Sequence, residues 1–308
     1  MSWPAEPVTV RVPATSANLG PGFDAFGLAL TLYDLVEARI TSGGLAIEVS
    51  GAGEEFVTAG EGHLVVRAMR AAFSALGGQP PGIGLRCVNA IPQGFGLGSS
   101  AGAIVAGLAA ARALWPGGAD AAGRSLSDQG LLRLATEMEG HPDNVAACQA
   151  GGLTIAWTID AVPRVARLDP VLALNPVLCI PDVPVPTEHA RQALPPTVPH
   201  GDAAANSARA ALLVAALTTD PALLLDATED FLHQRYRAAA MPASADLVGR
   251  LRAAGVPAVV SGAGPAVLGL TAAGSTPGAD VVASVAAAAG PAWEVLPLTV
   301  DRQGAVIL

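Results

Sequence analysis

The most informative stretch of this chain lies between residues 91 and 102 and reads Ile91-Pro92-Gln93-Gly94-Phe95-Gly96-Leu97-Gly98-Ser99-Ser100-Ala101-Gly102. An apolar strand pattern leads into three glycines at alternate positions, and two serines then open a helix pattern. Glycines let the backbone approach a ligand closely, and successive N–H groups can form an anion nest at the positive end of a helix. The stretch therefore predicts a triphosphate-binding loop whose serine hydroxyls bond phosphate oxygens or help to hold Mg²⁺.

Three other interpretations compete for the same residues. A Walker A loop needs a lysine after its last glycine, and the chain contains no lysine. The pattern Gly96-x-Gly98-x-x-Ala101 meets a dinucleotide fingerprint, so an NAD(P)-dependent oxidoreductase is an alternative of a different class. Asp120 lies at about the distance that this fingerprint requires, but in a Pro/Gly loop rather than at a strand end. The plainest alternative is a glycine-rich turn with an ordinary serine cap.

The composition favours a folded, acidic protein that binds neither nucleic acid nor membrane surfaces. Among 308 residues, 51% are apolar and 14% are charged, and the net charge is −9. Binding to phosphate backbones or anionic lipids needs clustered positive charge, which is missing here. The three cysteines are far apart and outside any CxxC pair, which disfavours a zinc site or a disulfide framework. With no signal-peptide pattern and no apolar run of ~20 residues, we expect a soluble, cytoplasmic protein.

Hydrophobic periodicity predicts strands and helices in balanced numbers without a strict β-α-β alternation. Strands are expected at 8–13, 28–40, 45–49, 82–91, 152–159, 177–180, 256–260, 266–271 and 293–299, and helices at 63–76, 99–114, 127–138, 203–218, 221–231, 244–254 and 279–289. This arrangement favours an α+β fold over a doubly wound sheet. We expect two domains, 1–160 and 161–297, with a last strand at about 298–308 that returns to the first domain.

Two more polar, glycine-bearing loops accompany the first one. Residues 14–24 follow a strand and read Ala14-Thr15-Ser16-Ala17-Asn18-Leu19-Gly20-Pro21-Gly22-Phe23-Asp24, and Ser261-Gly262-Ala263-Gly264-Pro265 lies between two apolar strands. In order and spacing, the three loops resemble the three motifs of the GHMP kinase superfamily, over nearly the whole chain. The resemblance implies ATP and Mg²⁺ as cofactors, with ATP contacts from Pro92, Gln93, Gly94, Phe95, Gly96, Leu97, Gly98, Ser99, Ser100, Ala101, Gly102, Gly262 and Gly264.

The same resemblance implies a two-domain fold. The N-terminal domain would be ribosomal-protein-S5-domain-2-like, with a left-handed βαβ unit that runs against the usual right-handed rule. The C-terminal domain would be ferredoxin-like. The habits of the superfamily also imply a homodimer.

Four further segments resemble the homoserine kinase branch of this superfamily, at residues 13–27, 139–146, 186–195 and 230–237. The branch implies that the chain phosphorylates the hydroxyl of L-homoserine with ATP, giving O-phospho-L-homoserine and ADP, a step of threonine biosynthesis. A mevalonate- or sugar-type kinase is the alternative within the superfamily, and a non-catalytic relative is another. The branch implies substrate contacts from Asn18, Asp24, His141, Asn144, Thr187, Arg191 and Arg237.

These residue types suit an α-amino acid. Guanidinium groups match carboxylates bidentately, so Arg191 and Arg237 are candidates for the substrate carboxylate, and Asp24 is the candidate for its ammonium group. Asn18, His141 and Asn144 could hold the remaining polar atoms, including the attacking hydroxyl. Each residue also has a plainer interpretation, as a solvated arginine on a helix or as a turn-forming His or Asp.

The predicted catalytic residues are Ser99, Glu137 and Asn144, and the predicted Mg²⁺ ligands are Ser99 and Glu137. Mg²⁺ usually takes few protein oxygens, because water and phosphate complete its six ligands. Glu139 is the competing metal ligand, two residues further on and therefore on another helix face. Because an amide such as Asn144 cannot act as a general base, the resemblance implies catalysis by positioning and electrostatics, with the hydroxyl proton lost late.

Overall fold

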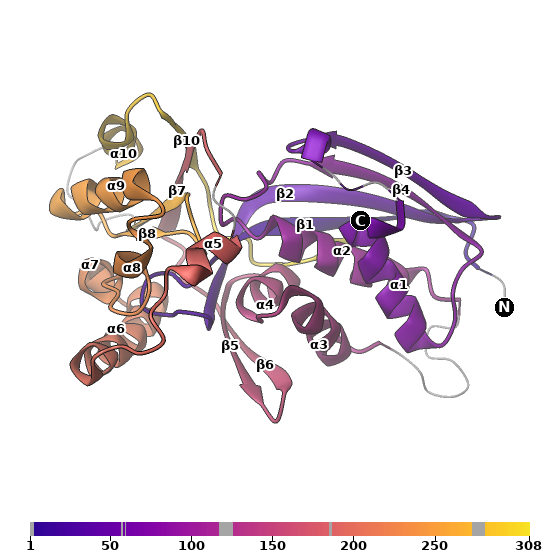
Figure 1. The fold of residues 1–308 in the computed structure, drawn as a ribbon, viewed down its shortest axis with the longest axis horizontal. Helices are drawn as coiled ribbons and strands as arrows, with labels where there is room; N and C mark the ends of the chain where they lie inside the picture. The colour runs from indigo at the N-terminus through magenta and orange to yellow at the C-terminus, as the bar shows by residue number, and fades with distance from the viewer. Residues whose placement is uncertain (1–2, 57, 59, 117–125, 185–186, 273–280) are drawn as a thin grey trace.

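The computed structural model describes residues 3–56, 58, 60–116, 126–184, 187–272 and 281–308. Over these residues the chain forms two sheets that lie side by side, each with its own helices (Figure 1). The expected α+β class is confirmed. Asp120, which the dinucleotide alternative would use, lies outside the described residues.

The first sheet gathers strands from the N-terminal half and from the end of the chain. Its strands are β1 (Val8–Ala17), β2 (Phe26–Thr41), β3 (Gly44–Gly51), β4 (Gly82–Asn89), β5 (Leu153–Ile159), β6 (Val162–Leu168) and β11 (Val306–Ile307). The order is β11-β1-β2-β4-β3, and β5 pairs with both β2 and β6. The parallel pair β3 and β4, connected through α1 (Leu64–Leu76), forms the sheet's βαβ unit, whereas β1–β2 and β2–β4 are antiparallel.

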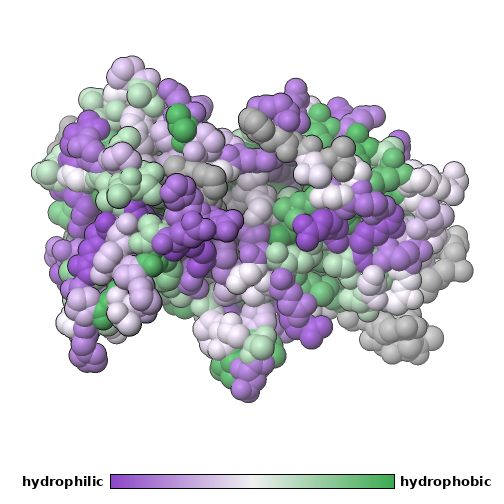
Figure 2. All heavy atoms as spheres, in the orientation of Figure 1, coloured by the Kyte–Doolittle hydropathy of each residue, from purple (hydrophilic) through white to green (hydrophobic). Residues whose placement is uncertain are grey.

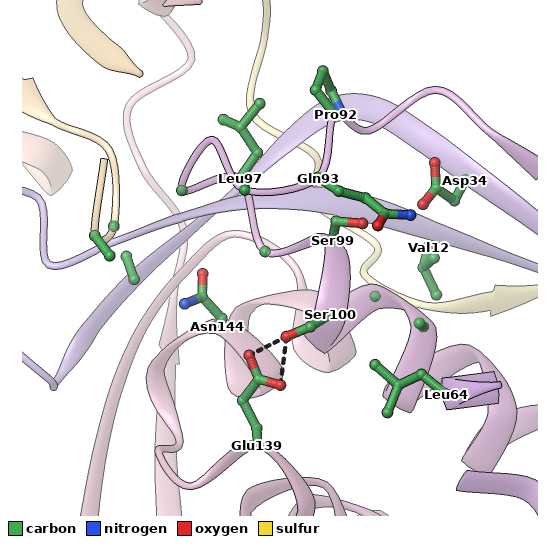
Figure 3. A pocket seen from close by; sticks show the side chains of 18 of the residues that line it. Val12, Asp34, Leu64, Pro92, Gln93, Leu97, Ser99, Ser100, Glu139 and Asn144 are labelled. Carbon is green, nitrogen blue, oxygen red and sulfur yellow. Dashed lines mark hydrogen bonds between the residues drawn. The ribbon is translucent and has the colours of Figure 1, made fainter. Parts of the chain in front are cut away.

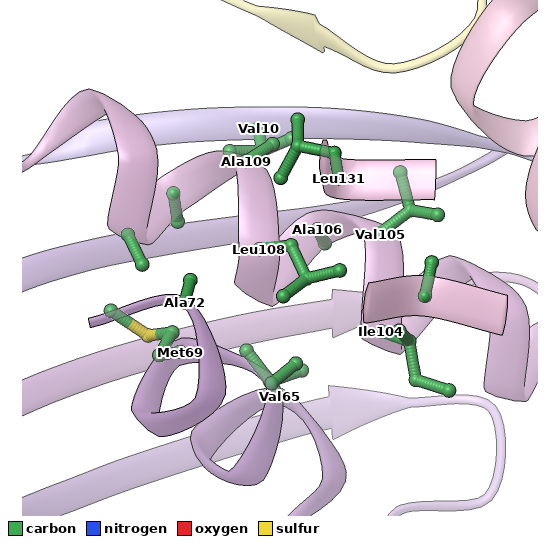
Figure 4. Packing of buried hydrophobic residues seen from close by; sticks show 14 of the residues in the cluster. Val10, Val65, Met69, Ala72, Ile104, Val105, Ala106, Leu108, Ala109 and Leu131 are labelled. Atoms are coloured by element: carbon green, nitrogen blue, oxygen red, sulfur yellow. The ribbon is translucent and has the colours of Figure 1, made fainter. Parts of the chain in front are cut away.

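Helices α1, α2 (Ser99–Ala113), α3 (Asp128–Glu139) and α4 (Asp143–Ala150) pack together against this sheet (Figure 1). Small residues let them approach closely. A Cβ on Gly107 would lie 2.5 Å from the backbone oxygen of Val65. Figure 4 shows Val65 and Met69 of α1 beside Leu108 and other apolar residues of α2. The helix that follows the predicted phosphate loop is therefore fixed in the centre of an apolar core.

The second sheet contains four strands from the C-terminal half. They are β7 (Leu174–Pro181), β8 (Ala258–Val260), β9 (Val267–Ala272) and β10 (Trp293–Pro297), in the order β10-β7-β9-β8 with antiparallel pairing throughout. Helices α6 (His200–Thr218) and α9 (Pro242–Ala253) separate β7 from β8, and α10 (Val281–Ala289) separates β9 from β10. This strand order is that of the ferredoxin-like arrangement implied by the resemblance.

The remaining elements are short and include one departure from the predicted helices. They are η1 (Glu54–Phe56), η2 (Gly60–Gly62), α5 (Thr187–Gln192), η3 (Pro221–Leu223), α7 (Leu224–Ala227) and α8 (Gln234–Arg237). The helix expected at 221–231 ends at Ala227. Beyond it, the Asp230 carboxylate accepts hydrogen bonds from the N–H groups of residues 232, 233 and 234. Asp230 thereby holds the turn that leads into α8, a helix that the apolar pattern did not predict.

The connection between the two halves also differs from the expectation. β6 lies beyond residue 160 but belongs to the first sheet, so the division between the sheets falls after Leu168. Pro163 obscured β6 in the sequence, yet proline is tolerated in edge strands such as this one. The predicted return of the chain end corresponds to β11, which pairs with β1. After α2 the chain runs through α3 and α4 to β5, which pairs antiparallel with β2, so the glycine loop is not part of a parallel dinucleotide-binding unit.

An apolar cluster joins the two halves. It includes Leu28 and Leu30 of β2, Leu178 of β7, Leu268 of β9 and Leu213 of α6. Figure 2 shows two lobes with a notch between them at the upper edge of this face. None of the helices in the described part of the chain is long and apolar enough to cross a membrane.

Candidate active site

A cleft of about 580 Å³ lies where the three glycine-bearing loops meet. Its walls also include residues of α3, α4, α5 and α8. The sequence-predicted residues that line it are Asn18, Asp24, Pro92, Gln93, Gly94, Gly96, Leu97, Gly98, Ser99, Ser100, Gly102, His141, Asn144, Arg191, Arg237 and Gly262. The fold thus brings together residues that are more than 200 positions apart in the sequence.

The glycine loop needs its glycines for conformation as well as for space. Gly94, Gly96 and Gly98 have φ values of 80°, 76° and 69°, in the left-handed region that side chains disfavour. Gly98 occupies the cap position of α2, and no side chain caps this helix. The N–H groups of its first turn are therefore open toward the cleft. This geometry suits the binding of an anion.

The third loop closes onto the glycine loop. The hydroxyl of Ser261 donates to the backbone oxygen of Gly96 at 2.8 Å, and the N–H of Ala266 donates to the oxygen of Phe95 at 3.2 Å. A Cβ on Gly96 would lie 2.1 Å from the backbone oxygen of Ser261. Gly96 is thus required for contact between the two loops.

Three residues predicted to contact the cofactor lie outside the cleft wall. Phe95 packs against the apolar cluster that joins the two halves, and Ala101, in the first turn of α2, is buried in the core. Gly264 faces Met241, because a Cβ there would lie 2.5 Å from its sulfur atom. These three residues support the loops from behind.

The acidic residue beside the phosphate loop is Glu139. The hydroxyl of Ser100 donates to both carboxylate oxygens of Glu139, at 2.5 and 2.6 Å (Figure 3). The predicted Glu137 does not line the cleft; its exposed side chain lies 3.7 Å from Arg133 on the preceding turn of α3. The two side chains point in different directions because two residues of helix turn a side chain to a different face.

The oxygen atoms at this end of the cleft suit a hard cation. In the described part of the chain, no three His, Cys, Asp or Glu residues are placed to hold a metal ion. One carboxylate and the serine hydroxyls beside a phosphate loop nevertheless fit Mg²⁺, which commonly takes one or two protein carboxylates and completes its shell with water and substrate phosphates.

Elsewhere in the cleft wall, two predicted substrate ligands bind each other. The Arg191 guanidinium donates to both carboxylate oxygens of Asp24, at 2.8 and 3.1 Å. Asn18 holds the Asp24 loop in place, since its Nδ2 donates to the Gly262 oxygen at 2.7 Å and its Oδ1 accepts from the Asp24 N–H at 2.9 Å. Asn18 and Asp24 both have positive φ, at 67° and 53°, so the loop is held in a strained conformation.

Arg237 is a buried cation rather than a solvated surface arginine. It is 1% exposed, yet it lines the cleft. Its Nε donates to the Ala190 oxygen at 3.2 Å, and its Nη1 donates to Nδ1 of His233 at 3.1 Å. His233 in turn donates from Nε2 to the Gly20 oxygen at 2.9 Å, which fixes its tautomer. Arg237 Nη1 also donates to the Gly262 oxygen at 3.3 Å, so the guanidinium is held by Ala190, His233 and the third glycine-bearing loop.

His141 and Asp143 form an ion pair at the N-terminal start of α4. His141 Nδ1 lies 2.6 Å from Asp143 Oδ1, and the Asp143 side chain is 2% exposed. Burial alone would lower the pKa of His141, but the hydrogen bond to Asp143 and the carboxylates of Asp143 and Glu139 outweigh burial and raise this pKa above its ordinary value.

The His141–Asp143 pair makes stability depend on pH. Because the folded-state pKa of His141 is raised above 6.5, the pair stabilises the fold fully below pH 6.5 and loses this contribution as the pH rises through the folded-state pKa. Asp143→Asn should lower the pKa of His141, because burial is then opposed by the Glu139 carboxylate without that of Asp143. NMR titration of the His141 ring protons measures both values, and a wild-type pKa below 6.5 would contradict the assignment.

The cleft has a further lobe whose polar residues were not predicted. The Asp34 carboxylate accepts from the N–H groups of Ala90 and Ile91 at 2.7 and 2.9 Å, immediately before the glycine loop, and burial raises its pKa. His63, 6% exposed, precedes α1, and its Nδ1 has no hydrogen-bond partner among the residues that the structure describes. Burial lowers the pKa of His63.

Only one of these two residues left a signal in the sequence. An acidic residue on the inward side of the β2 pattern, such as Asp34, breaks the apolar alternation and could have been noticed. Nothing in the sequence distinguishes His63 from a surface residue at a helix start. The predicted Thr187 begins α5, and its side chain lies outside the described part of the structure.

Comparison with known proteins relates this geometry to one family. Residues 63–152 match the family described as GHMP kinases N terminal domain, and residues 212–290 match GHMP kinases C terminal. The chain is 55% identical to a homoserine kinase of Streptomyces coelicolor over 304 residues, which cover 99% of this chain and 95% of that protein. It is 48% identical to a homoserine kinase of Leifsonia xyli, covering 97% and 91%.

Solved structures agree with this relationship. The crystal structure of homoserine kinase from Cytophaga hutchinsonii has a TM-score of 0.83 and 27% identity, covering 100% of this chain and 99% of that one. A putative homoserine kinase from Listeria monocytogenes has a TM-score of 0.75 and 29% identity, covering 98% and 99%. A mevalonate kinase, with a TM-score of 0.65, 11% identity and coverage of 96% and 99%, shares the fold alone.

Proposed function

The chain belongs to the GHMP kinase family, and on that premise we propose that it phosphorylates the side-chain hydroxyl of L-homoserine with ATP, giving O-phospho-L-homoserine and ADP. The relatives that match nearly the whole chain at 48–55% identity are homoserine kinases. This reaction is a step of threonine biosynthesis. The three free cysteines, all buried, suit a reducing cytoplasm, where we place the protein. Homodimerisation, a habit of the superfamily, stays a prediction.

One observation carries the proposal: a single cleft combines an anion-binding loop with opposite charges beside it. The loop at Gly94–Gly98 suits phosphates, whereas Arg191, Arg237 and Asp24 line the neighbouring region. A substrate with both a carboxylate and an ammonium group would complement these charges. Mevalonate has no ammonium group, and a neutral sugar has neither charge. An α-amino acid with a side-chain hydroxyl therefore fits this region best.

The residues that line the cleft suggest how ATP would be oriented in it. With its phosphates at the glycine loop and the acceptor beside Arg191, the nucleoside would extend toward Asp34 and His63. That lobe also contains Val36, Val65 and Cys87, so apolar walls surround the polar groups. A mixed apolar and polar pocket of this kind is typical of sites for a nucleobase.

We propose that Glu139 and the serine hydroxyls of Ser99 and Ser100 hold Mg²⁺ beside the phosphates. When bound, Mg²⁺ would neutralise charge that develops on the transferred phosphoryl group. The loop N–H groups and the start of α2 contribute the same kind of stabilisation from the protein. This arrangement replaces the expected role of Glu137, which is exposed and outside the cleft.

The residues around the acceptor favour positioning over base catalysis. Asn144 is an amide and cannot take a proton. Asp143 is adjacent, but its Oδ1 already binds His141 and the N–H of Asn144 at 2.7 Å. We therefore propose that the residues hold the hydroxyl in line with the phosphoryl group and that the hydroxyl loses its proton late, to phosphate.

A coupled assay of ADP release tests the proposal directly. L-homoserine, mevalonate, galactose and threonine would be compared as acceptors at saturating ATP. The highest kcat/KM is expected with L-homoserine. A higher kcat/KM with mevalonate or galactose would instead favour the alternative kinase types. Quenching of nicotinamide fluorescence by the protein, without ADP release, would point to the oxidoreductase.

Asn144→Ala should leave measurable activity. The substitution removes a group that orients the acceptor but no acid or base, so the loss in kcat should stay well below the ~10⁴-fold upper range for removing an acid/base group. Single-turnover measurements with saturating homoserine report the chemical step. A loss of ~10⁴-fold or more would require a different role for Asn144.

A further inference from the structure

Thr15 lies beneath both the glycine loop and Asn144, although it does not line the cleft. It belongs to β1 and is completely buried. Its hydroxyl donates to Oδ1 of Asn144 at 2.8 Å, although the two residues are 129 positions apart. Its backbone N–H donates to the oxygen of Leu97 at 2.9 Å. One residue therefore contacts the phosphate loop through its backbone and the Asn144 amide through its side chain.

The contact with the loop is unusually close. A Cβ on Gly98 would lie 1.9 Å from Thr15 Oγ1 and 3.2 Å from Asn144 Oδ1. The last glycine of the loop therefore closes directly over the hydrogen bond between these two side chains. Removing the Thr15 hydroxyl would remove the hydrogen bond that holds the Asn144 side chain. The tight packing of Gly98 leaves no space for another group to replace it.

The hydrogen bond also determines which atoms Asn144 presents to the cleft. A carboxamide has two orientations of nearly equal shape that exchange its oxygen and nitrogen. In Figure 3 the oxygen of Asn144 points toward the loop, and its nitrogen points away from Glu139. Because the oxygen accepts from Thr15, the Nδ2 donors remain available to oxygen atoms of a bound ligand.

We propose that Thr15 is a positioning residue that locks Asn144 as a hydrogen-bond donor toward the acceptor hydroxyl and the transferred phosphoryl group. The inference rests on the proposed kinase function. Without the Thr15 hydroxyl, the amide of Asn144 loses its partner and can turn its oxygen toward the negatively charged phosphate, where it repels rather than binds. The N–H groups of the glycine loop, which bind the phosphates of ATP, remain in place.

Kinetics of three Thr15 variants test this role. Thr15→Val and Thr15→Ala should lower kcat by about tenfold or more, because a misplaced Asn144 amide beside the reacting atoms slows the chemical step. The KM for ATP should stay within about twofold. Thr15→Ser, which keeps the hydroxyl, should restore most of kcat. Thr15→Ala also removes the hydroxyl without placing a methyl group beneath Gly98, so a defect seen only in Thr15→Val would indicate steric damage.

A double-mutant cycle separates positioning from structural support. In the Asn144→Ala background, Thr15→Ala should cause no further loss of kcat, because Thr15 then has nothing to orient. A loss that persists in this background, or a rise in the KM for ATP larger than the fall in kcat, would overturn the proposal. Thermal unfolding of each variant controls for loss of the folded state.

The same experiment keeps the two proposals distinguishable. The kinetics would be measured with whichever alcohol the wild type phosphorylates best. If that alcohol is not homoserine, the substrate assignment fails while the cycle still tests Thr15. If the wild type releases ADP with none of the alcohols, both proposals are overturned.

Discussion

Replacing Glu139 by glutamine should lower kcat by about 10²-fold or more, whereas Glu137→Gln should change kcat less than about twofold. Glu139 lines the cleft and accepts from Ser100 at the start of α2, where a phosphate-bound Mg²⁺ would need a negative ligand. Losses of this size are common when groups that hold a catalytic metal or stabilise its charge are removed. Glu137 lies on the same helix, two residues away, but is exposed near Arg133.

The pair of variants is matched in chemistry and in helix position. Each loses one negative charge in the last turn of α3, so a general effect on helix stability would appear in both. A titration of activity against Mg²⁺ should show weaker apparent Mg²⁺ binding for Glu139→Gln only. If Glu137→Gln had the larger effect, the proposed metal site would be wrong.

Arg191→Ala should raise the KM for homoserine by about 10²-fold and change the KM for ATP by no more than about threefold. The substitution removes a cation proposed to bind the substrate carboxylate, and loss of one partner of a charged hydrogen-bonded pair typically costs this much affinity. It also leaves Asp24 without its bidentate partner in the free protein. The phosphate loop is not touched, so ATP binding should be nearly unchanged.

A control for Arg191 exists on α6. Arg209 binds Glu229 at 2.8 Å. The exposed fractions of these side chains, 34% and 44%, are close to the 36% of Arg191 and the 37% of Asp24. Neither Arg209 nor Glu229 lines the cleft. Arg209→Ala should therefore leave both KM values unchanged. Equal changes in the two KM values for Arg191→Ala would contradict the carboxylate assignment.

The phosphate loop and the gathering of three loops could be predicted because local residue types determine them. Glycines at alternate positions followed by serines at a helix start have few structural uses, and Gly94, Gly96 and Gly98 adopt the positive φ values that favour glycine. The family pattern then related the loops to one another. The long strands and helices followed from periodicity, because tertiary packing agreed with the local preference.

The choice between Glu137 and Glu139 could not be made from the sequence. Both residues lie near the end of α3, whose buried residues are Leu131, Leu132 and Ala135. Which glutamate faces the cleft depends on where α3 ends, at Gly140, and on how the chain re-enters α4. A similar dependence on long-range contacts explains why Thr15 was not noticed: its partners Leu97 and Asn144 are distant in the sequence.

In the proposed substrate site, Asp24 and Arg191 form an ion pair whose one negative and one positive group match the two charges of a zwitterionic amino acid. A zwitterion can insert between them and give each a new partner, so neither charge is stranded. A hydroxy acid that lacks the amino group, or an amino alcohol that lacks the carboxylate, would separate the pair and satisfy only half of it. We therefore expect this ion pair to disfavour the binding of analogues that carry only one of the two charges.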